Sequence, residues 1–270
     1  MAQPPSKSAT PVLRAGLTEV LVTGMLIRWI SVRPRPMANE SLVRSRNIPA
    51  VALSNRLGNG GLYQMLKCGG VDLPKPAEYY GLALTLGGFG ISPVQLASLY
   101  AGLADDGLPK PLVFSAPAPI ANSQSPLLSS QSRFLVLDML RGGADLGVEY
   151  GFASTDPSVA WKTGTSHGFR DAWAVGVRGD YVIVVWLGNF NGRGNNALVA
   201  RRCAAPLMFD LFARLHLPDK AIVPTEGVRH VDLCATSGDL PGPWCAQTTS
   251  GWFIPVFHPF PCAGFIAKFS

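Results

Sequence analysis

The sequence of 270 residues predicts an α+β fold in which helices pack against an antiparallel sheet. Three observations predict it. Apolar residues recur at helical spacing before residue 141, three short β runs follow one another from residue 159, and helical spacing returns near residue 200. Hydrophobic residues make up 47% of the chain and charged residues 15%, so the chain can bury a sizeable core.

The first part of the chain is strongly basic. Residues 1–50 contain seven Lys and Arg side chains and two Glu, whereas the rest of the chain is close to neutral, within a total net charge of +6. We expect residues 1–36 to be a disordered leader, because Pro34 and Pro36 discourage regular structure. A nucleic acid or an anionic membrane surface is the alternative partner for such charge. No basic helix face supports that alternative, so we expect no nucleic-acid partner.

An apolar run over residues 17–30 is the only candidate for a membrane span or an export signal. Glu19 and Arg28 interrupt it, and crossing a bilayer needs about 20 apolar residues. No small-x-small cleavage site follows it. The sequence therefore predicts no clear signal or anchor.

Three short helices are expected after the leader. "NESLVRS" begins the first, with Asn39 or Ser41 as its cap, and a break follows over Ser45–Asn47. "IPAVALSNRLG" predicts a second helix, with Pro49 in its first turn and Gly58 after its end. "GGLYQMLKCGG" predicts a third.

Two longer helices follow. In "GISPVQLASLYAGLADDG", Ser92 is a cap, Pro93 fits the first turn, apolar residues recur at helical spacing and Gly107 ends the helix. In "SPLLSSQSRFLVLDMLRGG", the spacing predicts a helix over 130–140 that ends at a pair of glycines.

The sheet is predicted by "VAWKT", "DAWAVGV" and "YVIVVWLG", three β runs within residues 159–188. Arg178–Asp180 separates the last two runs and is typical of a tight hairpin turn, so an antiparallel meander is expected. A helix over 200–215 follows. Residues 219–270 are rich in Pro, Gly and Cys and show little periodicity, which predicts a small, separately packed tail.

The chain has five cysteines, and three of them lie in the tail. No CxxC or His-rich spacing is present, so we expect no metal site. Cys234 and Cys245 can form a disulfide if the domain lies in an oxidising compartment, and free buried thiols are the alternative. The sequence does not fix the pairing among the three.

Lys162-Thr163-Gly164-Thr165 opens the first strand and has the most informative side chains. On a strand, Lys162 and Gly164 point to one face, and Thr163 and Thr165 point to the other. A glycine lets another backbone approach closely, and an ammonium with nearby hydroxyls suits a carboxylate. A neighbouring backbone N–H can stabilise an oxyanion. Acyl transfer at a peptide C-terminus requires this combination of groups.

A Ser-x-Asn motif, Ser45-Arg46-Asn47, lies upstream at the break between two helices. Ser-x-Asn followed by Lys-Thr-Gly matches two of the three motifs of the penicillin-binding protein and β-lactamase superfamily. "SLVRSRNIPAVAL", "YGLALTLGGFGISPVQLASLYAGLADDG" and "KTGTSHGFRDAWAVGV" resemble consecutive pieces of the transpeptidase domain of class A penicillin-binding proteins. The tail resembles the segment that follows this domain, so the resemblance covers residues 37–262.

The resemblance implies a penicillin-binding/β-lactamase-like transpeptidase fold over residues 37–218, incomplete at its N-terminus, and a tail over 219–270. It implies D-Ala-D-Ala transpeptidation in peptidoglycan biosynthesis through a serine acyl-enzyme. Its partners would be the peptidoglycan stem peptide and β-lactams, with no cofactor. Complete family members also have a glycosyltransferase domain and a membrane anchor, and they act at the periplasmic face of the inner membrane.

The resemblance also implies roles for the motif residues. Ser45 would relay a proton near the nucleophile and the leaving group, and Asn47 would hold the catalytic lysine and a substrate carbonyl. Lys162 would supply positive potential to the substrate carboxylate and to the Ser45 hydroxyl. The alternative for Ser45 and Asn47 is that they only cap helices.

The remaining motif residues would bind substrate. Thr163 and Thr165 would bind the terminal carboxylate on either side of Gly164, with the Thr165 N–H facing the oxyanion. Asp171 and Trp173 match the family pattern too, and Trp173 is expected in the core.

The third motif of the superfamily, Ser-x-x-Lys, provides the nucleophile and its base, and no serine of the chain has lysine at that spacing. Ser41 and Ser130 have arginine there, which stays protonated and cannot activate a serine. We therefore expect an incomplete transpeptidase domain without acylation activity. The alternative is a non-catalytic module that binds stem peptides or cell-wall partners.

Overall fold

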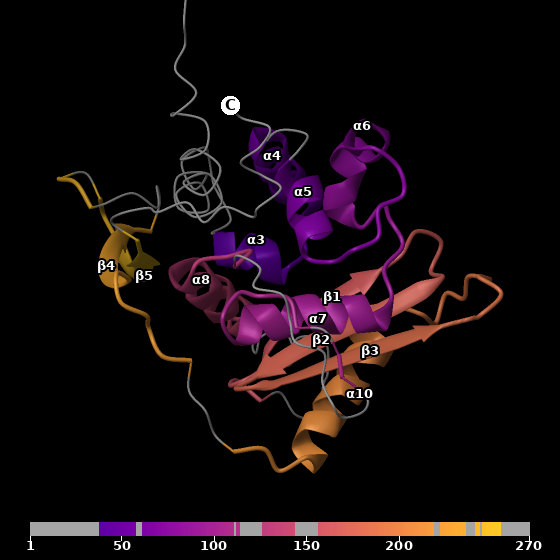
Figure 1. Ribbon diagram of the computed structural model, residues 1–270. Helices are drawn as coiled ribbons and strands as arrows, with labels where there is room; N and C mark the ends of the chain where they lie inside the picture. Colours follow the sequence, from indigo (N-terminus) through magenta and orange to yellow (C-terminus); the bar gives the residue numbers. More distant parts are fainter. Residues whose placement is uncertain are drawn as a thin grey trace, which may run out of the picture.

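The computed structural model describes residues 38–57, 61–110, 112–113, 126–143, 156–218, 222–235, 241–243 and 245–254. It confirms the predicted α+β class, because an antiparallel sheet lies between helices on its two faces (Figure 1). The expected leader over residues 1–36 lies outside the described residues. None of the helices in the described ranges combines the length and apolar character needed to cross a membrane.

The central sheet is the predicted meander. Strands β1 (Ala160–Thr165), β2 (Asp171–Arg178) and β3 (Tyr181–Gly188) pair antiparallel in the order β1-β2-β3. The last register pair of β2 and β3 leaves a loop of two residues, in which Gly179 has a φ of 55°. Glycine adopts this conformation without steric cost, so the predicted tight hairpin is confirmed.

One face of the sheet is covered by α10 (Ala200–Arg214). Its buried side chains include Met208 and Phe212, which pack on the small residues of β2. A Cβ at Gly176 would lie 2.6 Å from the Phe212 ring and 2.8 Å from the Met208 sulfur. Glycine at this position therefore allows the helix to approach the sheet.

The opposite face is covered by α7 (Pro93–Ala104) and α8 (Ser130–Arg141), so that α7 and α10 lie on opposite sides of the sheet (Figure 1). Ser92 and the Gln95 side chain form the full capping box at the start of α7, as its sequence predicts. The buried cluster on this face joins α8 to the sheet through Leu137, Leu140, Ala160 and Val177.

The three short helices are also confirmed, as α3 (Ala38–Val43), α4 (Asn47–Leu57) and α5 (Gly61–Cys68). The break between the first two is slightly earlier than expected, because Asn47 already belongs to α4. The sequence did not predict the next two elements, α6 (Ala77–Tyr80) and the 3-10 helix η2 (Gly81–Leu86). They are too short to show periodicity, and they pack in a separate small cluster.

The tail contains a hairpin that its composition did not predict. Strands β4 (Arg229–Cys234) and β5 (Thr248–Phe253) pair antiparallel. The Trp252 ring contacts Phe134 of α8 edge to face, with ring centroids 5.0 Å apart. The Gln131 side chain of α8 also donates a hydrogen bond of 3.0 Å to the Glu226 carbonyl. This part of the tail therefore packs on α8 and does not stand apart.

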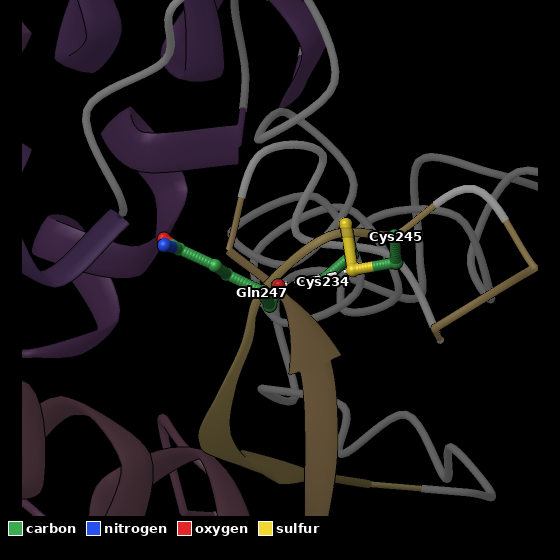
Figure 2. The surroundings of a disulfide bond; sticks show 3 residues. All are labelled: Cys234, Cys245 and Gln247. Carbon is green, nitrogen blue, oxygen red and sulfur yellow. Dashed lines mark hydrogen bonds between the residues drawn. A yellow bond between two sulfur atoms is a disulfide. The ribbon is translucent and has the colours of Figure 1, made fainter.

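A disulfide between Cys234 and Cys245 closes the loop that follows β4 (Figure 2). The Cα atoms of the two cysteines are 5.7 Å apart, which is ordinary disulfide geometry. Beside it, the Gln247 carbonyl accepts a hydrogen bond of 2.8 Å from the Ala235 N–H, which continues the β4–β5 pairing. Of the two alternatives for this pair of cysteines, the structure has the disulfide.

Candidate functional site

The Lys-Thr-Gly-Thr stretch forms β1, an edge strand of the sheet. Its alternation places Lys162 and Gly164 on the face of α7 and α8, and Thr163 and Thr165 on the face of α10. The Thr165 hydroxyl accepts a hydrogen bond of 3.1 Å from the Ala200 N–H. This contact holds the end of β1 against the first turn of α10.

Gly164 leaves open space at the middle of this strand. A Cβ built there would meet only the Trp173 Cβ, at 3.9 Å. Gly164 is exposed, and its register partner on β2 is Trp173. A ligand backbone can therefore approach the strand at this point, as expected from the residue type.

The turn between α3 and α4 has the geometry of a Schellman motif. The Arg46 N–H donates to the Ser41 carbonyl at 2.9 Å, and the Ser45 N–H donates to the Leu42 carbonyl at 3.1 Å. Ser45 has a φ of 54°, in the left-handed region that glycine usually occupies at the end of a helix. A serine in this conformation costs about 1 kcal/mol relative to glycine.

The Ser45 hydroxyl accepts hydrogen bonds from two cations. The Lys162 ammonium on β1 donates one of them, and the Arg201 guanidinium on α10 donates the other at 3.2 Å. Lys162 also donates to the Thr163 carbonyl at 2.8 Å. Two motifs that are 117 positions apart in the sequence therefore meet at one hydroxyl.

The charge of Lys162 is unfavourable in this environment. Burial, and then the positive charge of Arg201, lowers the pKa of Lys162 from 10.5 to about 8. Among the described residues, no carboxylate compensates by raising this pKa. Lys162 is therefore poised near neutral pH, where it can both donate and accept a proton.

The structure brings some of the predicted site residues together and leaves others apart. The side chains of Ser45 and Lys162 meet, and Lys162 also contacts the backbone carbonyl of Thr163. The side chains of Thr163 and Thr165 lie on the opposite face, where the Thr165 hydroxyl accepts a hydrogen bond from α10. Asn47 is the first residue of α4 and is exposed, and the hydrogen bonds of Lys162 do not include it. Ser45 ends a helix through its backbone while its side chain faces the site, so capping does not exclude a functional role.

Aromatic residues continue the same face of the sheet beyond Gly164. Trp173 is half-buried, and its ring contacts Trp186 on β3 with centroids 6.2 Å apart. The Trp186 indole N–H donates to the Asp171 carboxylate at 3.0 Å, which fixes that ring. Trp173 is therefore not one of the buried core residues that the sequence led us to expect, and its Cβ is the nearest atom to the open space at Gly164.

Sequence reasoning missed Arg201, which is 156 positions from Ser45. One signal could have found it. Arg201 follows Ala200 and precedes Ala204 and Ala205, the buried positions of the first turns of α10. Arg201 lies on the same face of α10 as these buried alanines, which is the face that packs on the sheet. Its long side chain can therefore extend past the edge of β1.

Comparison with known proteins shows which proteins the chain resembles. No family model matches it. It is 34% identical over 155 residues to penicillin-binding protein 1C of Escherichia coli, which covers 57% of this chain and 20% of that relative. It is 27% identical over 215 residues to penicillin-binding protein 1B of Haemophilus influenzae, which covers 73% of this chain and 26% of that relative.

A solved structure agrees with the fold. The chain superposes on penicillin-binding protein 1A from Haemophilus influenzae with a TM-score of 0.69 and 14% sequence identity, over 94% of this chain and 48% of that one. The fold is therefore the penicillin-binding fold. The chain spans between a fifth and about a quarter of the length of the curated relatives named above. Within that span, the chain is similar in sequence to penicillin-binding proteins 1C and 1B and has the fold of penicillin-binding protein 1A.

Proposed function

We propose that this chain is part of a D-Ala-D-Ala transpeptidase of peptidoglycan biosynthesis. The contact of Lys162 with Ser45 is the observation that carries the proposal. It joins the Ser-x-Asn and Lys-Thr-Gly motifs at an exposed strand edge, and the similarity to penicillin-binding protein 1C and the open space at Gly164 support peptide binding along this edge.

The proposal assigns the following roles to the residues of the site. Lys162 supplies positive potential to the terminal carboxylate of the stem peptide, and its lowered pKa lets it exchange a proton with Ser45. Ser45 relays that proton toward the leaving group. Thr163 binds the carboxylate, and the Thr165 N–H faces the oxyanion while the Thr165 side chain anchors β1 to α10.

Asn47 and the nucleophile complete the proposed mechanism. The exposed amide of Asn47 would bind a substrate carbonyl. The serine acyl-enzyme requires a Ser-x-x-Lys motif, which the 270 residues do not contain. We propose that this chain binds stem peptides and β-lactams without forming an acyl-enzyme.

The functions of whole class A proteins are proposed for the parent protein by family alone. They are glycosyl transfer by a second domain, anchorage in the membrane and action at the periplasmic face. The disulfide between Cys234 and Cys245 is consistent with an oxidising compartment such as the periplasm.

Two measurements on the purified chain test this function. The first follows binding of a D-Ala-D-Ala peptide by NMR titration of the wild type, of Lys162→Ala, and of Lys67→Ala, which removes an exposed lysine of α5. We expect saturable binding that Lys162→Ala abolishes and Lys67→Ala preserves. Equal binding by both variants, or none by the wild type, would contradict the proposed site.

The second measurement is incubation with a fluorescent penicillin, followed by denaturing electrophoresis and mass spectrometry. We expect no covalent adduct. A serine-linked adduct that Lys162→Ala removes would overturn the proposal that the chain cannot be acylated.

A further inference from the structure

The second cation at Ser45 has no role in the motif-based mechanism. Arg201 lies in the first turn of α10 and donates a hydrogen bond of 3.2 Å to the Ser45 hydroxyl. Lys162 donates to the same oxygen from β1. The site therefore contains two positive groups that come from different elements and converge on one atom.

This convergence orients the hydroxyl. A serine oxygen has two lone pairs, and here two cationic donors occupy both of them. The hydroxyl proton must then point away from Lys162 and Arg201, toward a third group that accepts it. Ser45 can therefore act only as a donor toward a ligand, with a proton that the two nearby cations make more acidic.

The proximity of the two positive charges is electrostatically unfavourable. Arg201 is one of the two causes that lower the pKa of Lys162, so the two cations repel each other across Ser45. Lys162 is half-buried and has no carboxylate partner among the described residues. An anion beside Lys162 and Arg201 would weaken this repulsion, because a negative charge offsets part of the positive potential at both groups.

The position of Arg201 is fixed by the fold. The Ala200 N–H, one residue earlier, donates to the Thr165 hydroxyl at 3.1 Å, which ties the first turn of α10 to the end of β1. Arg202 is the next residue, and it is exposed. One arginine of the pair is therefore directed to the site by helix geometry, and its neighbour provides a natural control.

We propose that Arg201 is a ligand-binding residue that, together with Lys162, binds the terminal carboxylate of the peptide and selects peptides with a free acid over those with a blocked C-terminus. This inference rests on the function proposed above, because it assigns a specificity-determining role within the same site. A planar guanidinium can contact both oxygens of a carboxylate, whereas an ammonium provides a single point charge.

The test compares two probes that differ only at their C-terminus. One is a peptide that ends in D-Ala-D-Ala with a free carboxylate, and the other is the same peptide with a C-terminal amide. Dissociation constants for both are measured by NMR titration with the wild-type chain, with Arg201→Gln, with Arg201→Lys and with the control Arg202→Gln. The acid-to-amide affinity ratio is the readout, because a variant that is partly unfolded weakens both peptides equally.

We expect the wild type and Arg202→Gln to prefer the acid by the same ratio. Arg201→Gln should reduce that ratio roughly tenfold or more, as expected from the loss of one charge-assisted hydrogen bond, and Arg201→Lys should restore part of it. An unchanged ratio in Arg201→Gln, while Lys162→Ala still loses binding, would overturn the role of Arg201 and leave the proposed function intact. No binding of the acid peptide by the wild type would overturn both.

Discussion

Replacing Lys162 by methionine should change how the stability of the chain depends on pH. Methionine has a similar length and volume but cannot take a proton. The wild type has an ammonium in an unfavourable place, where its pKa is about 8, whereas the ordinary value in an unfolded chain is 10.5. The difference between the two proteins therefore isolates the titration of one group.

The direction of the effect follows from these two values. Below about pH 8, Lys162 is protonated in both the folded and the unfolded state, so the cost of its charge is fully present. Between about 8 and 10.5, the folded protein releases the proton while the unfolded chain keeps it, so stability rises with pH. Integrated from about pH 7 to about pH 9.5, the wild type should gain about 2 kcal/mol of unfolding free energy relative to Lys162→Met.

Urea unfolding followed by far-UV circular dichroism measures this quantity. Free energies of unfolding are determined for both proteins at the two pH values, and the two pH-dependent changes are subtracted. Every other titrating group cancels in that subtraction. Parallel pH dependence of the two proteins, or a wild type that loses stability relative to the variant as the pH rises, would refute the assignment of a lowered pKa to Lys162.

Substitutions at three further positions test the packing, the open strand edge and the turn. Gly176→Ala should destabilise the chain by about 1–3 kcal/mol in urea unfolding, because the new methyl group would lie 2.6 Å from the Phe212 ring. Gly164→Ala should leave stability within about 0.5 kcal/mol but weaken binding of a D-Ala-D-Ala peptide in NMR titration, because its methyl group meets only open space on the ligand side. Ser45→Gly should be more stable than Ser45→Ala by about 1 kcal/mol, because φ is 54° there, while both variants lose peptide binding. Equal stability of the two Ser45 variants would contradict the turn geometry.

Most of the central fold could be predicted from the sequence because its signals are local. The cap at Ser92 with Gln95, and the tight turn between the last two β runs, each depend on a few neighbouring residues. The sequence did not predict the hairpin β4–β5, because its signals are not local. Its strands are separated by a long segment, and Gly251 in β5, where a Cβ would lie 2.7 Å from the Leu233 side chain, is not a strand former. Only tertiary pairing makes that segment a strand.

The site could be predicted only in part. Residue types and spacing indicated the chemistry of Lys162, Thr163 and Thr165, but the pairing of Lys162 with Ser45 came from family resemblance, because nothing local relates positions so far apart. The pKa of Lys162 could not be predicted at all, since it depends on burial and on Arg201. The helix periodicity that directs Arg201 toward the sheet was present in the sequence. That periodicity indicates a site residue only when the position of α10 beside β1 is known.

The backbone of Ser45 shows how local stability and function compete in this chain. Glycine would satisfy the turn between α3 and α4 at lower cost, and the sequence has serine. Lys162 and Arg201 repel each other, and the fold nevertheless holds both against the same hydroxyl. Neither feature improves stability, and the two meet at one atom. The strained backbone and the repulsion between the two cations therefore coincide at the Ser45 hydroxyl, which is where our proposal places the terminal carboxylate of the peptide.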